Sequence, residues 1–137
     1  MWNRDDLISA EELQGEITQR TVQFAQRFGT YLAEKVEGDN SVKPLTTSQL
    51  RKFFGEVKRQ QLIGYEPTSF VMLKPKLAYA VGRAKQNGRG FFKIEDFYYV
   101  LADAIDKVEI ATDKKRAFKN FITAFEAIVA YHKASEK

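Results

Sequence analysis

Cysteine is absent from this chain of 137 residues, proline occurs three times, and histidine occurs once. Without cysteine, the chain can form no disulfide bond, no thiolate zinc site and no cysteine nucleophile. Its longest apolar runs are only a few residues, and no charged segment precedes an apolar run at the start. We therefore expect no membrane span, no secretory signal and a cytoplasmic location.

Residues suited to catalysis are also scarce. The single histidine, His132, continues the apolar stripe of the last predicted helix, so we expect a packed imidazole rather than a general base or a metal ligand. The chain has no GxxxxGK phosphate loop, and residues 86–89 lack the acidic spacing of a calcium loop. We predict that the protein is not an enzyme and has no catalytic residues, no metal site and no cofactor.

The apolar residues of every substantial segment follow a helical period, and none alternates convincingly as in a strand. The predicted helices cover residues 9–36, 47–64, 67–84, 94–108 and 112–129. A chain of this length forms one domain by the usual size range. We therefore predict a single all-α domain over residues 1–137, folded as a compact bundle of about five helices with antiparallel neighbours.

Local signals predict how the first helix begins and where it is interrupted. Ser9 and Glu12 have the spacing of a capping box. Glycine is unfavourable in the interior of a helix. Gly15 and Gly29 are therefore expected to weaken or break this helix before its end near Val36.

Similar signals apply to the second and third helices. Thr47 is predicted to cap the second helix, which should end around Gly64. Pro75 lacks an amide hydrogen and clashes with the preceding turn, so a kink or a break is expected at Lys74. Residues 87–90 have the composition of a turn.

The distribution of charge is the most informative feature of the chain. Residues Lys43 to Lys93 hold eleven of the 22 basic residues and only two of the 18 acidic residues. This segment has a formal charge of +9 and the rest of the chain −5, which together give the net charge of +4. A basic middle between acidic ends is typical of a surface that meets phosphates, although a solvated lysine-rich face gives the same pattern.

The second predicted helix carries cations that repeat at an interval of seven residues beside its apolar stripe. They are Arg51, Lys52, Lys58 and Arg59. Gly55 lies between them, where a ligand backbone could approach closely.

Two cations and one aromatic residue lie along one line of the third predicted helix, namely Lys76, Tyr79 and Arg83. Single-stranded nucleic acid needs both kinds of side chain, because phosphates bind cations with counterion release and unpaired bases stack on rings. Arg89, in the following turn, adds a flexible cation beside this face. The alternative for Tyr79 is a core residue whose hydroxyl finds a partner at the edge.

A smaller basic cluster stands at the start of the fifth predicted helix. Its members are Lys114, Lys115, Arg116 and Lys119. Cations at a helix N-terminus interact unfavourably with the helix dipole, and a bound anion would relieve this. The other explanation, which we favour, is that Asp113 and the solvent compensate.

Two strings of residues resemble a known family. Thr47–Val57 reads TSQLRKFFGEV, and Leu73–Arg83 reads LKPKLAYAVGR after Phe70. In this order and separation they resemble the small subunit of the type III-A CRISPR effector, the Csm complex, most strongly over Leu45 to Arg83. The resemblance implies a small all-helical subunit that is not a nuclease and that is present in several copies along a ribonucleoprotein filament.

The implied role is to hold target RNA along the filament and so to contribute to antiviral defence. The implied partners are target RNA, the crRNA-containing complex with its backbone and Cas10-type large subunits, and other copies of the chain, without a membrane. The basic positions of the family pattern correspond to Arg51, Lys52, Lys58, Arg59, Lys74, Lys76, Tyr79 and Arg83. Charge and periodicity indicate the same residues independently.

Two other functions fit the same charge pattern. The first is a helical adaptor whose basic face docks an acidic protein, and the second is a helix-turn-helix protein that binds DNA. A salt-sensitive preference for single-stranded RNA over duplex DNA separates the RNA-binding subunit from both.

Overall fold

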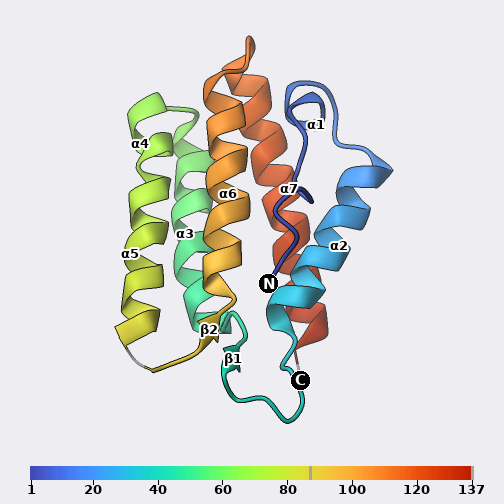
Figure 1. The fold of residues 1–137 in the computed structure, drawn as a ribbon. Helices are drawn as coiled ribbons and strands as arrows, with labels where there is room; N and C mark the ends of the chain where they lie inside the picture. Colours follow the sequence, from blue (N-terminus) through green and yellow to red (C-terminus); the bar gives the residue numbers. More distant parts are fainter. Residues whose placement is uncertain (87, 137) are drawn as a thin grey trace.

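The computed structural model describes residues 1–86 and 88–136. Its helices are α1 (Ala10–Gln14), α2 (Gln19–Ala33), α3 (Thr47–Ile63), α4 (Pro67–Val71), α5 (Leu73–Gln86), α6 (Ile94–Glu109) and α7 (Lys114–Ser135) (Figure 1). Five of them, α2, α3, α5, α6 and α7, have between 14 and 22 residues. The predicted all-α bundle of about five helices is therefore confirmed.

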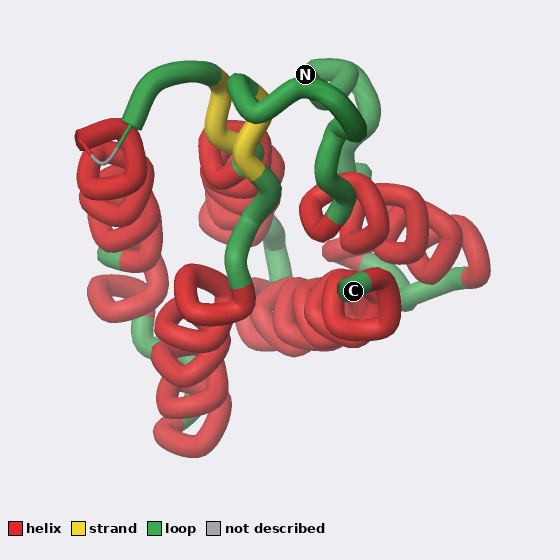
Figure 2. Tube along the Cα trace, turned by 90° about the horizontal axis from the view of Figure 1, so that it is seen from below, coloured by secondary structure: helices red, strands yellow, loops and turns green. Residues whose placement is uncertain are grey.

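One small sheet is present that the sequence did not predict. Strands β1 (Val42–Lys43) and β2 (Phe91–Phe92) pair in parallel and join the loop after α2 to the loop after α5 (Figure 2). Two-residue strands are too short to show an alternating pattern, which explains why they were missed.

The central helix of the bundle is α7. It packs most extensively against α2 and also contacts α1, α3 and α6. Helix α5 packs mainly against α6. Both views place α3 and α5 on the side of the bundle away from α2 (Figures 1 and 2). The outer sides of α3 and α5 are therefore open to a ligand.

Aromatic rings fill the core between α3, α4, α6 and α7. Phe53 of α3 packs edge to face on Phe97 of α6 and on Phe125 of α7, with ring centroids 5.7 Å and 5.4 Å apart. Phe70 of α4 makes the same kind of contact with Phe121 of α7 at 5.2 Å. All five rings are buried. Each buried side chain contributes roughly 1.5–3 kcal/mol, so these rings determine how the helices sit on α7.

The first predicted helix begins and breaks as expected at its first glycine. Ser9 accepts a hydrogen bond from the amide of Glu12, and the Glu12 carboxylate accepts one from the amide of Ser9. This confirms the capping box. Gly15 ends α1, and α2 starts separately after Thr18.

Gly29 is expected to weaken or break the first helix, and α2 continues through it without a break. A Cβ atom at this position would lie 2.6 Å from the backbone oxygen of Ile128 and 2.9 Å from the backbone nitrogen of His132, both on α7. Glycine is therefore needed for the close approach of α2 to α7. The helix ends at Ala33, before the predicted end near Val36.

Helix α3 is capped one residue earlier than predicted. Thr46, and not Thr47, accepts a hydrogen bond from the amide of Gln49 at 3.1 Å. The side-chain oxygen of Gln49 accepts one from the amide of Thr46 at 2.8 Å. The two bonds form a reciprocal capping box. The predicted exit at Gly64 is confirmed, and its φ of 101° suits glycine.

The break associated with Pro75 falls at Met72 rather than at Lys74. Helix α4 ends before Met72, and α5 begins at Leu73. Pro75 therefore occupies the first turn of α5, where its missing amide hydrogen would have had no partner within the helix. The expected break was right and its position was wrong by two residues.

The predicted turn at 87–90 is described only from Gly88 onward, because Asn87 lies outside the described residues. Gly90 has a φ of 108°, and a Cβ atom there would lie 2.0 Å from the backbone oxygen of Ser41. Glycine at this position lets the amide of Phe91 donate to that oxygen at 2.7 Å.

Gly29→Ala and Gly55→Ala form a matched pair for testing the packing, since both residues are interior to a long helix. Gly29→Ala places a methyl group against the backbone of α7 and should lower the free energy of unfolding by about 1–3 kcal/mol. Gly55 faces open space. Gly55→Ala should therefore raise the free energy of unfolding by roughly 0.5–1 kcal/mol, because alanine has the higher helix propensity. Urea unfolding of both variants measures the difference, and equal effects would contradict the packing role of Gly29.

Candidate nucleic-acid interface

Six of the nine predicted RNA-binding residues share one exposed surface, which we name the basic face. It consists of Arg51, Lys52 and Arg59 on α3 and of Lys76, Tyr79 and Arg83 on α5. Lys52 and the three α5 residues line the same groove. Arg59 and Lys76 contact the same carboxylate. Arg51 is exposed at the edge of this surface, because its spacing of seven residues places it on the same side of α3 as Lys58.

A groove of about 330 Å³ separates α3 from α5. Its α3 wall carries Ser48, Lys52 and Glu56, which follow one another at the four-residue spacing of one helix face. Its α5 wall carries Lys76, Tyr79, Ala80 and Arg83. Its floor consists of the buried apolar residues Phe53, Leu77, Ala84, Ile94 and Phe97. The groove therefore combines an apolar floor with a rim of cations.

Glu56 is the one acidic residue among those that line this groove. Its carboxylate lies 2.8 Å from Arg59 Nη2 and 2.9 Å from Lys76 Nζ, and it also accepts a hydrogen bond from Gln60 at 3.1 Å. The hydrogen bonds from Arg59, and then those from Lys76 and Gln60, lower the pKa of Glu56 to about 2. Glu56 is therefore ionised and holds two cations of the basic face in place.

The other three cations of the basic face have no ionic partner among residues 1–86 and 88–136. They are Arg51, Lys52 and Arg83. Like charges without counter-ions repel one another and raise the local positive potential, which attracts anions. The positive charge of this surface is therefore available to a ligand.

Tyr79 is exposed, with 68% of its surface accessible. The alternative in which Tyr79 belongs to the core is therefore wrong. Its ring stands on the α5 wall between Lys76 and Arg83. A flat ring in this position can stack with an unpaired base while the neighbouring cations contact phosphates.

Three predicted RNA-binding residues lie outside the basic face. Lys58 pairs with Glu126 of α7, at 3.0 Å. Lys74 points from the opposite edge of α5 to Asp106 of α6, which raises the pKa of Lys74. Arg89 is exposed in the loop before β2. The cations of Lys58 and Lys74 are engaged within the fold, so we expect them to contribute less to a ligand.

Lys93 belongs to the basic segment but not to its surface. It is 3% exposed, and its Nζ donates to the backbone oxygens of Tyr31 and Glu34 at 2.5 Å and 2.9 Å. Burial lowers the pKa of Lys93. Close by in sequence, Asp96 accepts hydrogen bonds from the Tyr31 hydroxyl at 2.6 Å and from the Trp2 amide at 3.0 Å. These contacts fasten the N-terminal segment and α2 to α6, and sequence reasoning missed them.

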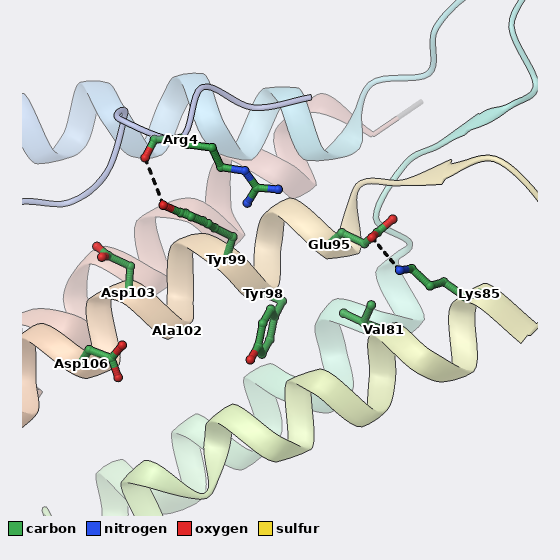
Figure 3. A pocket seen from close by; sticks show the side chains of 9 residues that line it. All are labelled: Arg4, Val81, Lys85, Glu95, Tyr98, Tyr99, Ala102, Asp103 and Asp106. Atoms are coloured by element: carbon green, nitrogen blue, oxygen red, sulfur yellow. Dashed lines mark hydrogen bonds and ion pairs between the residues drawn. The ribbon is translucent and has the colours of Figure 1, made fainter.

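A second pocket, of about 570 Å³, lies along the opposite edge of α5, against α6 and the N-terminal segment (Figure 3). Arg4 stacks over the ring of Tyr99 at 4.1 Å, and Lys85 pairs with Glu95 at 2.8 Å. Two further carboxylates line the pocket, those of Asp103 and Asp106. Acidic side chains outnumber basic ones here, so this pocket suits phosphates poorly.

The structure bears on two expectations about residues outside the interface. His132 is 1% exposed, and its Nε2 lies 2.8 Å from the backbone oxygen of Leu45, so it is a packed residue. Asp113 caps α7 by accepting a hydrogen bond from the amide of Arg116 at 3.1 Å. Asp113 thus places a negative charge at the basic start of the helix, as the favoured explanation requires.

Among residues 1–86 and 88–136, no group of three or more histidine, aspartate and glutamate side chains could hold a metal ion. Within the same ranges, no helix is both long enough and apolar enough to cross a membrane.

The chain matches a known protein family. A family model described as Csm2 Type III-A matches residues 16–137, which include all of α2 to α7 and the whole basic face. No curated protein and no solved structure matches the chain significantly.

The ion pairs of Glu56 predict a specific dependence of stability on pH. Its pKa falls from 4.5 to about 2 on folding. The resulting stabilisation is complete above about pH 4.5 and is lost as the pH falls through about 2. Glu56→Gln should therefore be less stable than the native chain at neutral pH, and the difference should shrink between these two values.

Urea unfolding at a series of pH values measures this difference. Glu37→Gln is the matched control, because Glu37 is exposed and has no hydrogen bond or ion pair with any described residue. A Glu56→Gln difference that stays constant from pH 7 to pH 2 would contradict the assigned role of the carboxylate.

Proposed function

This chain belongs to the Csm2 family, the small subunit of the type III-A CRISPR effector or Csm complex, and we propose that it holds target RNA through the basic face. Members of the family bind target RNA in antiviral defence and are generally non-catalytic, which agrees with the scarcity of catalytic residues in the sequence. They assemble within a complex that contains crRNA.

The proposal rests above all on the free cations of the basic face. Arg51, Lys52 and Arg83 are exposed and have no ionic partner among the described residues. When these cations neutralise phosphates of a single strand, they release the counter-ions condensed on the RNA, and the entropy of this release favours binding. Tyr79 adds a ring on which a base can stack, so one surface offers both interactions that single-stranded RNA requires.

Two glycines in helix interiors give further support. Gly55 of α3 and Gly82 of α5 both face open space, and no neighbouring atom would meet a Cβ there. Each costs roughly 1 kcal/mol of helix stability relative to alanine, and no contact within the fold requires it. Because Gly55 and Gly82 have no side chain, a ligand backbone can come close to the two helices that carry the basic face.

We extend the proposal to protein partners, which are the backbone subunits, the Cas10-type large subunit and other copies of the chain. Helices α3 and α6 end on the same side of the bundle (Figure 1). Large apolar side chains are exposed at these ends, with Leu62 at 89%, Ile63 at 67% and Ile110 at 76%. Apolar residues exposed together are typical of protein contacts. A partner docked at this end would leave the basic face to RNA.

Neutralising a free cation should weaken RNA binding more than neutralising a paired one. We expect Lys52→Ala and Arg83→Ala to lower the affinity for single-stranded RNA almost equally for all sequences, and to reduce the slope of log K against log salt by about 0.7 each. Lys58→Ala is the control, since Glu126 already neutralises Lys58. Filter binding at several salt concentrations, with duplex DNA as competitor, measures these effects. A larger effect of Lys58→Ala would contradict the proposed face.

Tyr79 should contribute through stacking and not through charge. We expect Tyr79→Ala to weaken single-strand binding by roughly 1–3 kcal/mol per stacked base without changing the salt slope. Tyr79→Phe keeps the ring and should bind almost normally. Because the side chain is 68% exposed, both variants should unfold at nearly the native temperature. A Tyr79→Ala protein that melts early but binds RNA normally while folded would count against stacking.

The apolar end of the bundle should act in assembly. Replacing Leu62 and Ile63 together by serine should leave the unfolding temperature nearly unchanged, because both are exposed, and should reduce incorporation into reconstituted Csm complexes. Val36→Ser is the control, as Val36 is 45% exposed in the loop after α2, at the other end of the bundle. Native mass spectrometry counts the incorporated copies, and unchanged stoichiometry would argue against this contact.

A further inference from the structure

We propose that the groove between α3 and α5 is a subsite for one unstacked nucleobase of single-stranded RNA. The inference rests on the proposed function and goes beyond it. The basic face explains contact with phosphates, whereas the groove would take a base out of the strand and hold it between the two helices.

The size and lining of the groove fit a single ring system. Its volume is about 330 Å³, close to the lower limit of about 300 Å³ for small-molecule sites. The floor residues Leu77, Ile94 and Phe97 are buried, and the α5 wall adds the half-buried Ala80 and the exposed ring of Tyr79, so the accessible apolar surface of the groove lies along this wall. A base is flat and largely apolar on its faces, and it gains by leaving water for such a surface.

The α3 wall offers hydrogen-bonding groups that the fold leaves unused. The hydroxyl of Ser48 makes no hydrogen bond with any described residue. Gln49 accepts one bond through Oε1 from the amide of Thr46, and its amide nitrogen has no acceptor within the described residues. A carboxamide and a hydroxyl at the edge of an apolar slot can pair with the polar edge of a base.

Cations stand where the strand would enter and leave the groove. Lys52 on the α3 wall and Arg83 on the α5 wall are both without an ionic partner in the described part of the chain. Lys76 is held across the groove by Glu56 at 2.9 Å. With the base between the helices, the phosphates on either side of it can reach Lys52 and Arg83, so the same cations serve the strand and the inserted base.

Filling the groove tests the inference without removing any charge. Ala80 is a half-buried residue of the α5 wall, and Ala78 is exposed on the same helix outside the groove. The full-length chain carrying Ala80→Leu is compared with Ala78→Leu in filter binding. The probes are a single-stranded RNA and an RNA of the same length whose central residues lack their bases.

We expect Ala80→Leu to weaken binding of the intact RNA by roughly 5- to 150-fold, the range that one stacked base represents. The slope of log K against log salt for Ala80→Leu should equal that of the native chain, because this substitution removes no cation. Ala78→Leu should bind as the native chain does. The abasic RNA should bind the native chain and Ala80→Leu equally, because it has no base to insert.

Two other outcomes separate the base subsite from the proposed function. If intact RNA binds with the expected salt dependence but Ala80→Leu equals Ala78→Leu, the base subsite is overturned while the RNA-binding role stands. If no variant of the basic face alters RNA binding, both are overturned. Should Ala80→Leu fail to fold, Ser48→Leu closes the groove from the exposed α3 wall, and thermal unfolding verifies that the variant used is native.

Discussion

The edge-to-face packing of Phe53 against Phe97 and Phe125 is the contact on which the rest of the structure depends. It joins α3 to α6 and α7 in one core. Helix α5 in turn packs on α6, so α3 and α5 are positioned mainly through a common neighbour, and the Glu56–Lys76 ion pair links them directly. A groove remains between them, and Phe53 and Phe97 form part of its floor. The packing that stabilises the bundle therefore also creates the surface that we assign to RNA.

The helices could be predicted because their apolar residues repeat over many turns, whereas the errors concern single contacts between distant segments. The sequence predicts only that Gly29 weakens or breaks its helix, but the role of Gly29 depends on the backbone of α7, about a hundred residues away. Strands β1 and β2 are too short to leave a pattern. The cap at Thr46 instead of Thr47 is a local error, since both positions offer a threonine before the same apolar stripe.

The candidate site was predicted less completely, because the sequence shows where cations occur but not whether they are paired. Lys58 and Lys74 are neutralised by acids 68 and 32 residues away, and Lys93 is buried among partners at least 59 residues away. No periodicity signals such contacts. The pair of Glu56 with Arg59 is different, since its spacing of three residues is visible in the sequence.

Stability and function make opposite demands on the two sides of α3. The inner side of α3 stabilises the fold. It carries the buried ring of Phe53, and the Gln60 side chain donates a hydrogen bond to the backbone oxygen of Ser69 at 2.9 Å. The outer side carries unpaired like charges and an interior glycine, which weaken a helix. Helix α5 repeats the combination with Arg83, Gly82 and an exposed tyrosine. Unpaired cations and an interior glycine thus destabilise both helices that flank the groove. A ligand that contacts the cations, stacks on the ring and approaches the open backbone explains all of these features together. A surface exposed only to solvent explains the charges alone.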